Sequence, residues 1–186
     1  MNRFIAEFIQ KHKQLILDNK FFELYELAHK ELDFSNQIGE LTHILLSSGI
    51  DPIKQGQLSS VPADYLYMDD NVTEFIVPSN VIKIENSAFQ GCQYLRQINL
   101  NNVQEIEYYA FNRCYSLMRI DLPEGLKTIG DYAFSGTGIT SVIIPKSATL
   151  IRSNAFDSHV EYLVYKDSPM AKIAAAEGIH SYNFVD

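Results

Sequence analysis

The sequence predicts an α+β fold in which a short solenoid of about four to five stacked repeats carries a helical N-terminal cap and a C-terminal capping helix. The main observation is an Ala-Phe dipeptide that recurs at steps of 22, 23 and 22 residues. Its phenylalanines are Phe89, Phe111, Phe134 and Phe156. The second observation is that residues 1–50 lack this repeat and show the apolar spacing of amphipathic helices instead.

Residues 1–57 are expected to form the helical N-terminal capping region. Three apolar stripes at helical spacing lie in this segment: Phe4, Phe8 and Leu15; Phe21, Tyr25, Ala28 and Leu32; and Ile38, Leu41 and Leu45. Helices this short are not stable alone, so they should pack together and cover the open end of the solenoid. A second binding surface on the same helices is the alternative. A connector follows, with one strand expected at Tyr65–Met68.

Residues 58–186 are expected to contain the solenoid and its C-terminal cap. An isoleucine stands five residues before each phenylalanine, and an apolar triplet with three-then-two spacing follows it. The triplets are Leu95, Ile98 and Leu100; Leu117, Ile120 and Leu122; Ile139, Val142 and Ile144; and Val160, Leu163 and Tyr165. Alternation of apolar and polar residues in each triplet predicts a half-buried strand. Because stacked strands lie about 4.8 Å apart, the four phenylalanines should form one buried aromatic ladder.

The repeated pattern "I…AF..C..L..I.LP" resembles the BspA-like leucine-rich repeat of Treponema-type bacterial surface antigens. The resemblance covers Val72 to Tyr165, and the tail "SPMAKIAAAEGIHSYNF" is similar to the short helix and last strand that close such arrays. It implies a right-handed leucine-rich-repeat solenoid that acts as a protein-binding module of a bacterium or phage. The third and fourth repeats depart from the pattern, because Thr137 replaces the cysteine and both repeats are shortened.

The composition limits the kinds of partner that the protein can have. The chain has 15 Lys and Arg against 23 Asp and Glu, which gives a net charge of −8. This charge disfavours nucleic-acid binding, which needs a basic patch, and is compatible with a basic protein partner. No apolar run reaches the ~20 residues that cross a bilayer, so no membrane contact is expected. Because polar residues interrupt the apolar ones near the N-terminus, no secretory signal is predicted and a cytoplasmic location is expected.

Two cysteines occupy the same position of successive repeats. Stacking would place the Cα atoms of Cys92 and Cys114 about 5 Å apart, which is within disulfide range. A ladder of buried, reduced thiols is the expected state, and a regulatory disulfide or reactive thiol is the alternative. Two thiolates alone cannot complete a tetrahedral zinc site, so no structural zinc is predicted.

The sequence contains no recognisable set of catalytic residues. The stretch "DSHVE" places Asp157, Ser158 and His159 side by side. A catalytic triad, in contrast, joins residues that are distant in sequence. The other histidines are isolated and lack metal-binding spacing. The sequence therefore predicts a protein that is not an enzyme and needs no cofactor or metal.

The predicted function is protein–protein interaction through the exposed side of the triplet strands, which we call the strand surface. Its predicted contact residues are Arg96, Gln97, Asn99, Met118, Arg119, Asp121, Ile143, Glu161 and Tyr162. Arginine, methionine and tyrosine are enriched at protein interfaces. The alternative is an intracellular inhibitor that is encoded by a phage or mobile element and directed at a host protein, such as a defence enzyme. Adhesion at the cell surface requires an export signal. The sequence predicts no oligomeric state.

Overall fold

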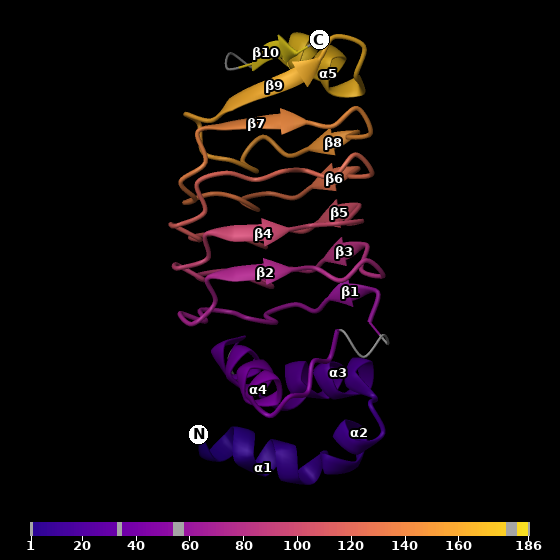
Figure 1. Ribbon diagram of the computed structural model, residues 1–186, viewed down its shortest axis with the longest axis vertical. Helices are drawn as coiled ribbons and strands as arrows, with labels where there is room; N and C mark the ends of the chain where they lie inside the picture. The colour runs from indigo at the N-terminus through magenta and orange to yellow at the C-terminus, as the bar shows by residue number, and fades with distance from the viewer. Residues whose placement is uncertain (1, 33–34, 54–57, 178–181, 186) are drawn as a thin grey trace.

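A computed structural model of the chain describes residues 2–32, 35–53, 58–177 and 182–185. The molecule is an elongated stack with the two termini at opposite ends (Figure 1). Four helices lie at the N-terminal end of the described residues, the solenoid forms the middle, and one helix and one strand lie at the C-terminal end. The predicted α+β solenoid with helical ends is confirmed.

The N-terminal helices are α1 (Arg3–Lys11), α2 (Lys13–Leu17), α3 (Phe21–Glu31) and α4 (Ser35–Ser47). The first predicted helix is divided at His12, whose ring lies 4.6 Å from that of Phe8. The placement of Phe4 on the apolar face is wrong, because its side chain is 60% exposed and Ile5 is buried instead. The buried pair of α1 is Ile5 and Phe8, which are three residues apart and therefore share one face of the helix.

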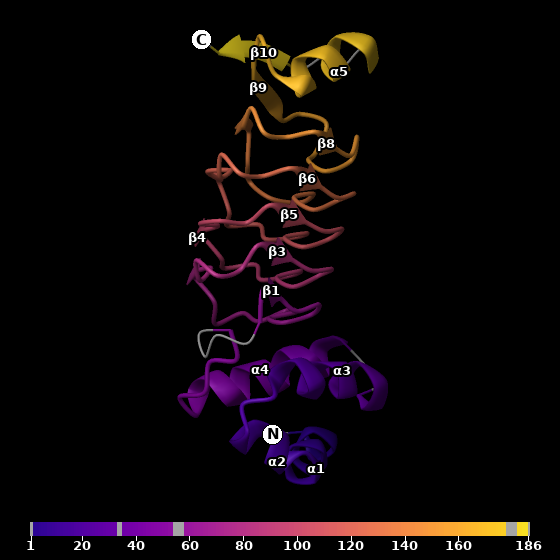
Figure 2. The same cartoon turned by 90° about the vertical axis from the view of Figure 1, so that its right-hand side faces the viewer.

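Within the described residues the solenoid has five rungs, and each contributes a short strand to a parallel sheet of five strands. Their order is β1 (Ser60–Val61), β3 (Lys83–Ile84), β5 (Glu105–Ile106), β6 (Thr128–Ile129) and β8 (Leu150–Ile151). The triplet strands lie on another side of the stack, as Figures 1 and 2 show. They are β2 (Glu74–Ile76), β4 (Gln97–Asn99), β7 (Ser141–Ile144) and β9 (Glu161–Tyr165).

The strand expected at Tyr65–Met68 in the connector is wrong. These residues form the turn of a complete rung that begins at β1. The backbone N–H of Leu66 donates to the carbonyl of Ala88, just as that of Phe89 donates to Ala110. Leu66 therefore occupies the position that phenylalanine holds in the later rungs.

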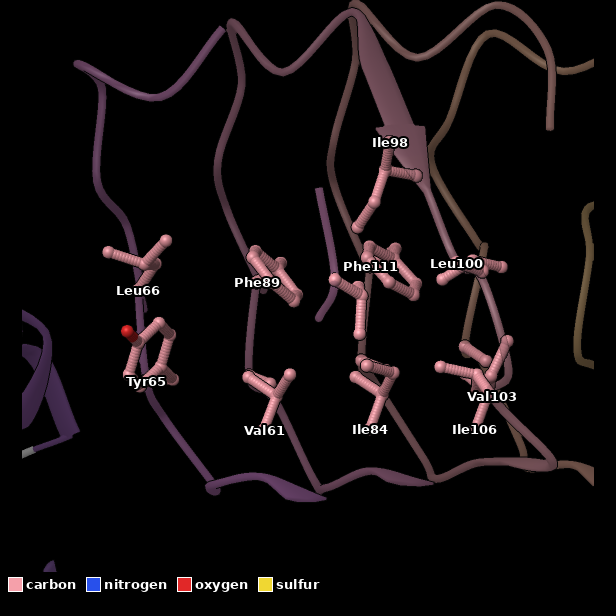
Figure 3. Packing of buried hydrophobic residues seen from close by; sticks show 14 of the residues in the cluster. Val61, Tyr65, Leu66, Ile84, Phe89, Ile98, Leu100, Val103, Ile106 and Phe111 are labelled. Atoms are coloured by element: carbon pink, nitrogen blue, oxygen red, sulfur yellow. The ribbon is translucent and has the colours of Figure 1, made fainter. Parts of the chain in front are cut away.

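The core of the solenoid is an aromatic ladder. Phe89, Phe111, Phe134 and Phe156 stack with ring centroids 5.1, 5.1 and 4.8 Å apart and with interplanar angles of 9°, 12° and 8°. All four are buried, which confirms the predicted ladder. Figure 3 shows the rings of Phe89 and Phe111 in a row with Leu66 and Leu100, above a second row that includes Val61, Ile84 and Ile106.

The rungs turn through the left-handed region of backbone conformation at two columns of equivalent residues. The first column is Asp64, Ser87, Tyr109 and Tyr132, and the second is Met68, Gly91, Arg113 and Gly136. All eight residues have φ between 56° and 77°. Glycine adopts this conformation without steric cost, which explains Gly91 and Gly136. The tyrosines of the first column have no such freedom.

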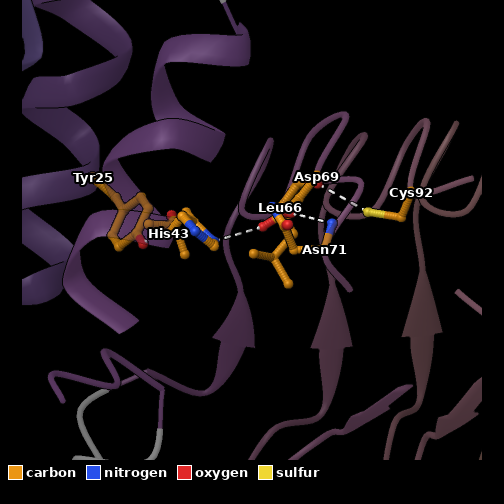
Figure 4. Close-up of polar contacts among 7 residues, drawn as sticks. Tyr25, His43, Leu66, Asp69, Asn71 and Cys92 are labelled. Atoms are coloured by element: carbon orange, nitrogen blue, oxygen red, sulfur yellow. Dashed lines mark hydrogen bonds and ion pairs between the residues drawn. The ribbon is translucent and has the colours of Figure 1, made fainter. Parts of the chain in front are cut away.

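The helices cover the first rung of the solenoid. His43 Nδ1 of α4 lies 3.1 Å from the Asp69 carboxylate, which is nearly buried (Figure 4). His29 of α3 lies 3.7 Å from Asp64. At the other end of the stack, α5 (Pro169–Glu177) follows β9, and β10 (Tyr182–Val185) pairs with β9 in parallel. The backbone N–H of Ala171 donates to the Ser168 hydroxyl at the start of α5.

Candidate protein-interaction surface

The strand surface holds most of the predicted contact residues. Arg96, Gln97 and Asn99 lie in or beside β4, and all are exposed. Met118, Arg119 and Asp121 follow in the third rung and Ile143 in β7, all likewise exposed. Glu161 of β9 is partly exposed, and its carboxylate accepts a hydrogen bond from the side-chain amide of Asn183 in β10.

The expected orientation of Tyr162 is wrong. Tyr162 pairs with the buried Val142, and its ring packs edge-on against Phe156 with centroids 5.7 Å apart. Desolvation by burial raises the pKa of its hydroxyl to about 12. The residues that take the outward positions of β9 are Leu163 and Tyr165, which were expected inside.

A shortened repeat explains this error. Ile120 precedes its equivalent Val142 by 22 residues, whereas Val142 precedes its partner Tyr162 by only 20. The fifth rung carries the fourth Ala-Phe repeat, and its inward residues therefore lie two residues apart, at Val160, Tyr162 and Val164. Because successive strand residues face opposite sides, the shift of one residue reverses the orientation of every later side chain in β9.

The third rung, which carries the second Ala-Phe repeat with Phe111, interrupts the sheet of the strand surface. Strand β2 pairs with β4, and β9 pairs with both β7 and β10, but the segment Met118–Leu122 between these two sheets belongs to neither. Its backbone makes no hydrogen bond with any residue that the structure describes. In Figure 1 this segment is the ribbon without an arrow between β4 and β7. Arg119 and Asp121 thus project from a rung whose backbone polar groups are not engaged within the sheet.

Two hollows flank this unpaired rung. The first, of about 380 Å³, lies on the β4 side and is lined by Arg96, Gln97, Ile98, Asn99, Arg119 and Asp121. The second, also about 380 Å³, lies toward β7 and β9 and includes Ile143, Leu163 and Tyr165. Arg119 and Asp121 line both hollows. A polar hollow and a more apolar one therefore meet at the same two side chains.

The charges and apolar side chains of the strand surface are available for contact. Neither Arg96 nor Arg119 forms an ion pair with a described residue, although the chain carries a net charge of −8. Ile76, Met118 and Ile143 are 66%, 64% and 52% exposed. A guanidinium offers a planar set of donors that fits a carboxylate, and clustered apolar side chains gain from burial.

Cys92 and Cys114 are free, buried thiols. The Sγ of Cys92 lies 2.9 Å from the carbonyl of Leu66, a contact drawn in Figure 4, and that of Cys114 lies 3.1 Å from the carbonyl of Phe89. Each thiol thus donates to the preceding rung. Burial raises the pKa of Cys92 to about 12 and that of Cys114 well above its ordinary value, so both remain protonated and weakly nucleophilic near neutral pH.

The stretch "DSHVE" has a local structural role. The carboxylate of Asp157 accepts hydrogen bonds from the Ser135 hydroxyl at 2.8 Å and from the Gly136 N–H at 2.9 Å. Asp157 therefore holds the corner of the preceding rung. Within the described residues, no group of three or more His, Cys, Asp or Glu side chains has a metal-binding arrangement. The described helices also include none with the length and hydropathy to span a bilayer.

The fold defines a leucine-rich-repeat solenoid, a class typical of protein-interaction modules. Residues 59–168 match the family described as "BspA type Leucine rich repeat region (6 copies)", and the chain belongs to this family. The crystal structure of a leucine-rich repeat protein of T. pallidum is similar, with 31% identity, a TM-score of 0.53, and coverage of 57% of this chain and 51% of that one.

A leucine-rich repeat protein from Bacteroides ovatus is also similar, with 36% identity and a TM-score of 0.52. The match covers 56% of this chain and 28% of that one. The chain therefore spans only about half, or less, of these two solved structures. The search of curated proteins found no match.

Proposed function

We propose that this protein is a non-catalytic interaction module that binds a protein partner through the strand surface, centred on the unpaired third rung. The single observation that carries the proposal is that Arg119 and Asp121 line two adjoining hollows while the backbone of their segment is left out of the sheet. Rigid repeats lose little conformational freedom on binding, so a partner can use these groups at low entropic cost.

The net charge indicates which kind of protein approaches, and the local charges indicate which chemical group of the partner reaches the strand surface. The net charge of −8 favours the approach of a basic protein over long distances. Arg96 and Arg119 lack carboxylate partners within the described residues, so the part of the partner that reaches the hollows should carry a carboxylate. Ile143 and Leu163 in the neighbouring hollow would take an apolar side chain beside it.

A charge-reversal experiment tests this proposal. A partner captured on the immobilised full chain would be identified by mass spectrometry and then titrated by calorimetry. Arg119→Glu should weaken binding by about 2–4 kcal/mol, because a charged group at the centre of an interface loses its partner. The matched control Lys13→Glu makes the same charge change on α2, outside the strand surface, and should leave the affinity unchanged. Equal loss in both variants would show a long-range charge effect and reject the proposed contact.

A phage-encoded inhibitor of a host protein would be one form of this function, and it would also bind its target through the strand surface.

The cytoplasmic location expected from the sequence stays a prediction, which fractionation of cells that express the natural gene would test. Neither statement affects the charge-reversal experiment, because that experiment depends only on the presence of a protein partner.

A further inference from the structure

The first left-handed corner of the solenoid carries an exposed group of three tyrosines. Tyr109 and Tyr132 stack with centroids 5.3 Å apart and an interplanar angle of 7°, and Tyr108 meets Tyr109 edge-on at 5.3 Å. Tyr108 and Tyr132 are 48% and 40% exposed. This group, the tyrosine corner, follows directly after β5 and β6 and is separate from the strand surface.

Two of these tyrosines have a backbone conformation that is rare for residues with bulky side chains. Tyr109 and Tyr132 both have φ of 58°, in the left-handed region. The equivalent residues of the earlier rungs, Asp64 and Ser87, share this conformation with φ of 57°, whereas Asn154 of the next rung does not. Small polar residues tolerate this conformation better, and the cost of an ordinary side chain there is roughly 1–2 kcal/mol. The fold of the corner therefore does not require tyrosine.

The aromatic stack ends at Tyr132, which is 40% exposed. Asn154 stands at the position that a third ring would take, and its amide lies 3.5 Å from the Tyr132 hydroxyl. Within the described residues no cation contacts these rings, since the one cation–π contact joins Lys146 to Tyr165. Aromatic faces attract a guanidinium, which can lie flat against a ring.

A carboxylate on the residue before Tyr132 adds charge complementarity. Asp131 directly precedes Tyr132, is partly exposed, and forms no ion pair or side-chain hydrogen bond with a described residue. The carboxylate of Glu107 in the preceding rung is already paired with Lys83. Asp131 is thus the available anion of the corner, in a chain of net charge −8. Partly exposed aromatic rings, with an unpaired carboxylate on the residue before Tyr132, match the flat shape and the positive charge of a guanidinium.

We propose that the tyrosine corner is a second interaction surface that takes an arginine side chain from an extended basic peptide segment. The guanidinium stacks on the aromatic rings and pairs with Asp131. This proposal does not depend on the strand surface. It predicts that the chain can contact a protein partner at two places on its solenoid.

A peptide titration on the full chain tests the proposal, with an amide NMR spectrum as the readout. The probe is a blocked nonapeptide of alternating arginine and glycine, and the same peptide with citrulline is the neutral control. Shifts should concentrate at Tyr109, Asp131 and Tyr132, and the citrulline peptide should bind more weakly. No shift at millimolar arginine peptide, or equal binding of both peptides, would overturn the proposal.

The decisive variant uses the residues that this column holds in neighbouring rungs. The double change Tyr109→Ser and Tyr132→Asn should lower the affinity of the arginine peptide about tenfold. It should leave the melting temperature unchanged or raise it, because serine and asparagine relieve the backbone strain. Tyr94→Ser, at another exposed tyrosine, is the control and should leave peptide binding unchanged.

Two outcomes would contradict the inference. If the double variant binds the peptide as well as the unchanged chain, the rings are not the contact. If it melts well below the Tyr94→Ser variant, the tyrosines are needed for packing and the argument from strain fails. Arg119→Ala on the strand surface should not affect peptide binding, so failure of this proposal and failure of the proposed function are distinguishable.

Discussion

Replacing Phe111 by alanine tests the aromatic ladder at its centre. The Phe111 ring is fully buried and lies 5.1 Å from the rings of both Phe89 and Phe134. Truncation leaves a cavity between two rigid neighbours that cannot move together without breaking the spacing of the rungs. A buried phenylalanine replaced by alanine loses about 3–5 kcal/mol, and the tight spacing favours the upper part of this range.

Urea unfolding followed by far-ultraviolet circular dichroism measures this loss, since the chain contains no tryptophan. The melting temperature should fall by roughly 6–20 °C, because each kcal/mol corresponds to about 2–4 °C in a chain of this size. Phe184→Ala is the control, since that ring is 50% exposed, and it should change stability by less than about 1 kcal/mol. If Phe111→Ala costs no more than this control, the ring is not packed in a ladder.

Further changes test other parts of the structure. Cys92 and Cys114 should react with an alkylating agent only after denaturation, and rapid labelling of the native chain would contradict their burial. The free energy of unfolding should fall as the pH rises from about 9 toward about 12, because burial raises the pKa of Cys92 from 9.0 to about 12 and the folded state then retains a proton that the unfolded state loses. Asp157→Ala should cost about 1–2 kcal/mol in thermal unfolding, through the loss of two hydrogen bonds to the preceding corner. Tyr162→Ala should lower the melting temperature more than Tyr165→Ala, because only Tyr162 packs against the core. The reverse order would support the register expected from the sequence, in which Tyr165 points inward and Tyr162 outward.

Most of the fold could be predicted because the repeat period is visible in the sequence. The Ala-Phe steps identify the ladder, and the structure places all four rings in it. The turn of the first rung was not recognised because Tyr65-Leu66 replaces Ala-Phe there, and only the stacking of Leu66 on the next rung reveals the equivalence. A pattern search depends on residue identity, whereas the fold requires only an apolar side chain at that position.

The candidate site could be predicted less well, for two physical reasons. A missing residue in the fourth repeat reverses the orientation of Tyr162, and the triplet pattern alone does not reveal where a deletion falls. The unpaired third rung was not predictable either, because its apolar triplet matches that of the paired rungs. Sheet pairing depends on the spacing between backbones, which the apolar pattern does not encode. The same limitation applies to the two hollows beside Arg119.

Hydrogen–deuterium exchange across Met118–Leu122, with and without the captured partner, tests the central proposal most directly. In the free chain these amides should exchange fast, because their N–H groups have no hydrogen-bond partner among the described residues, while those of β4 and β7 should be slower. Binding of the partner to the strand surface should slow exchange in this segment more than anywhere in α1 to α4. Unchanged exchange at Met118–Leu122, with new protection confined to the helical cap, would contradict the proposed surface.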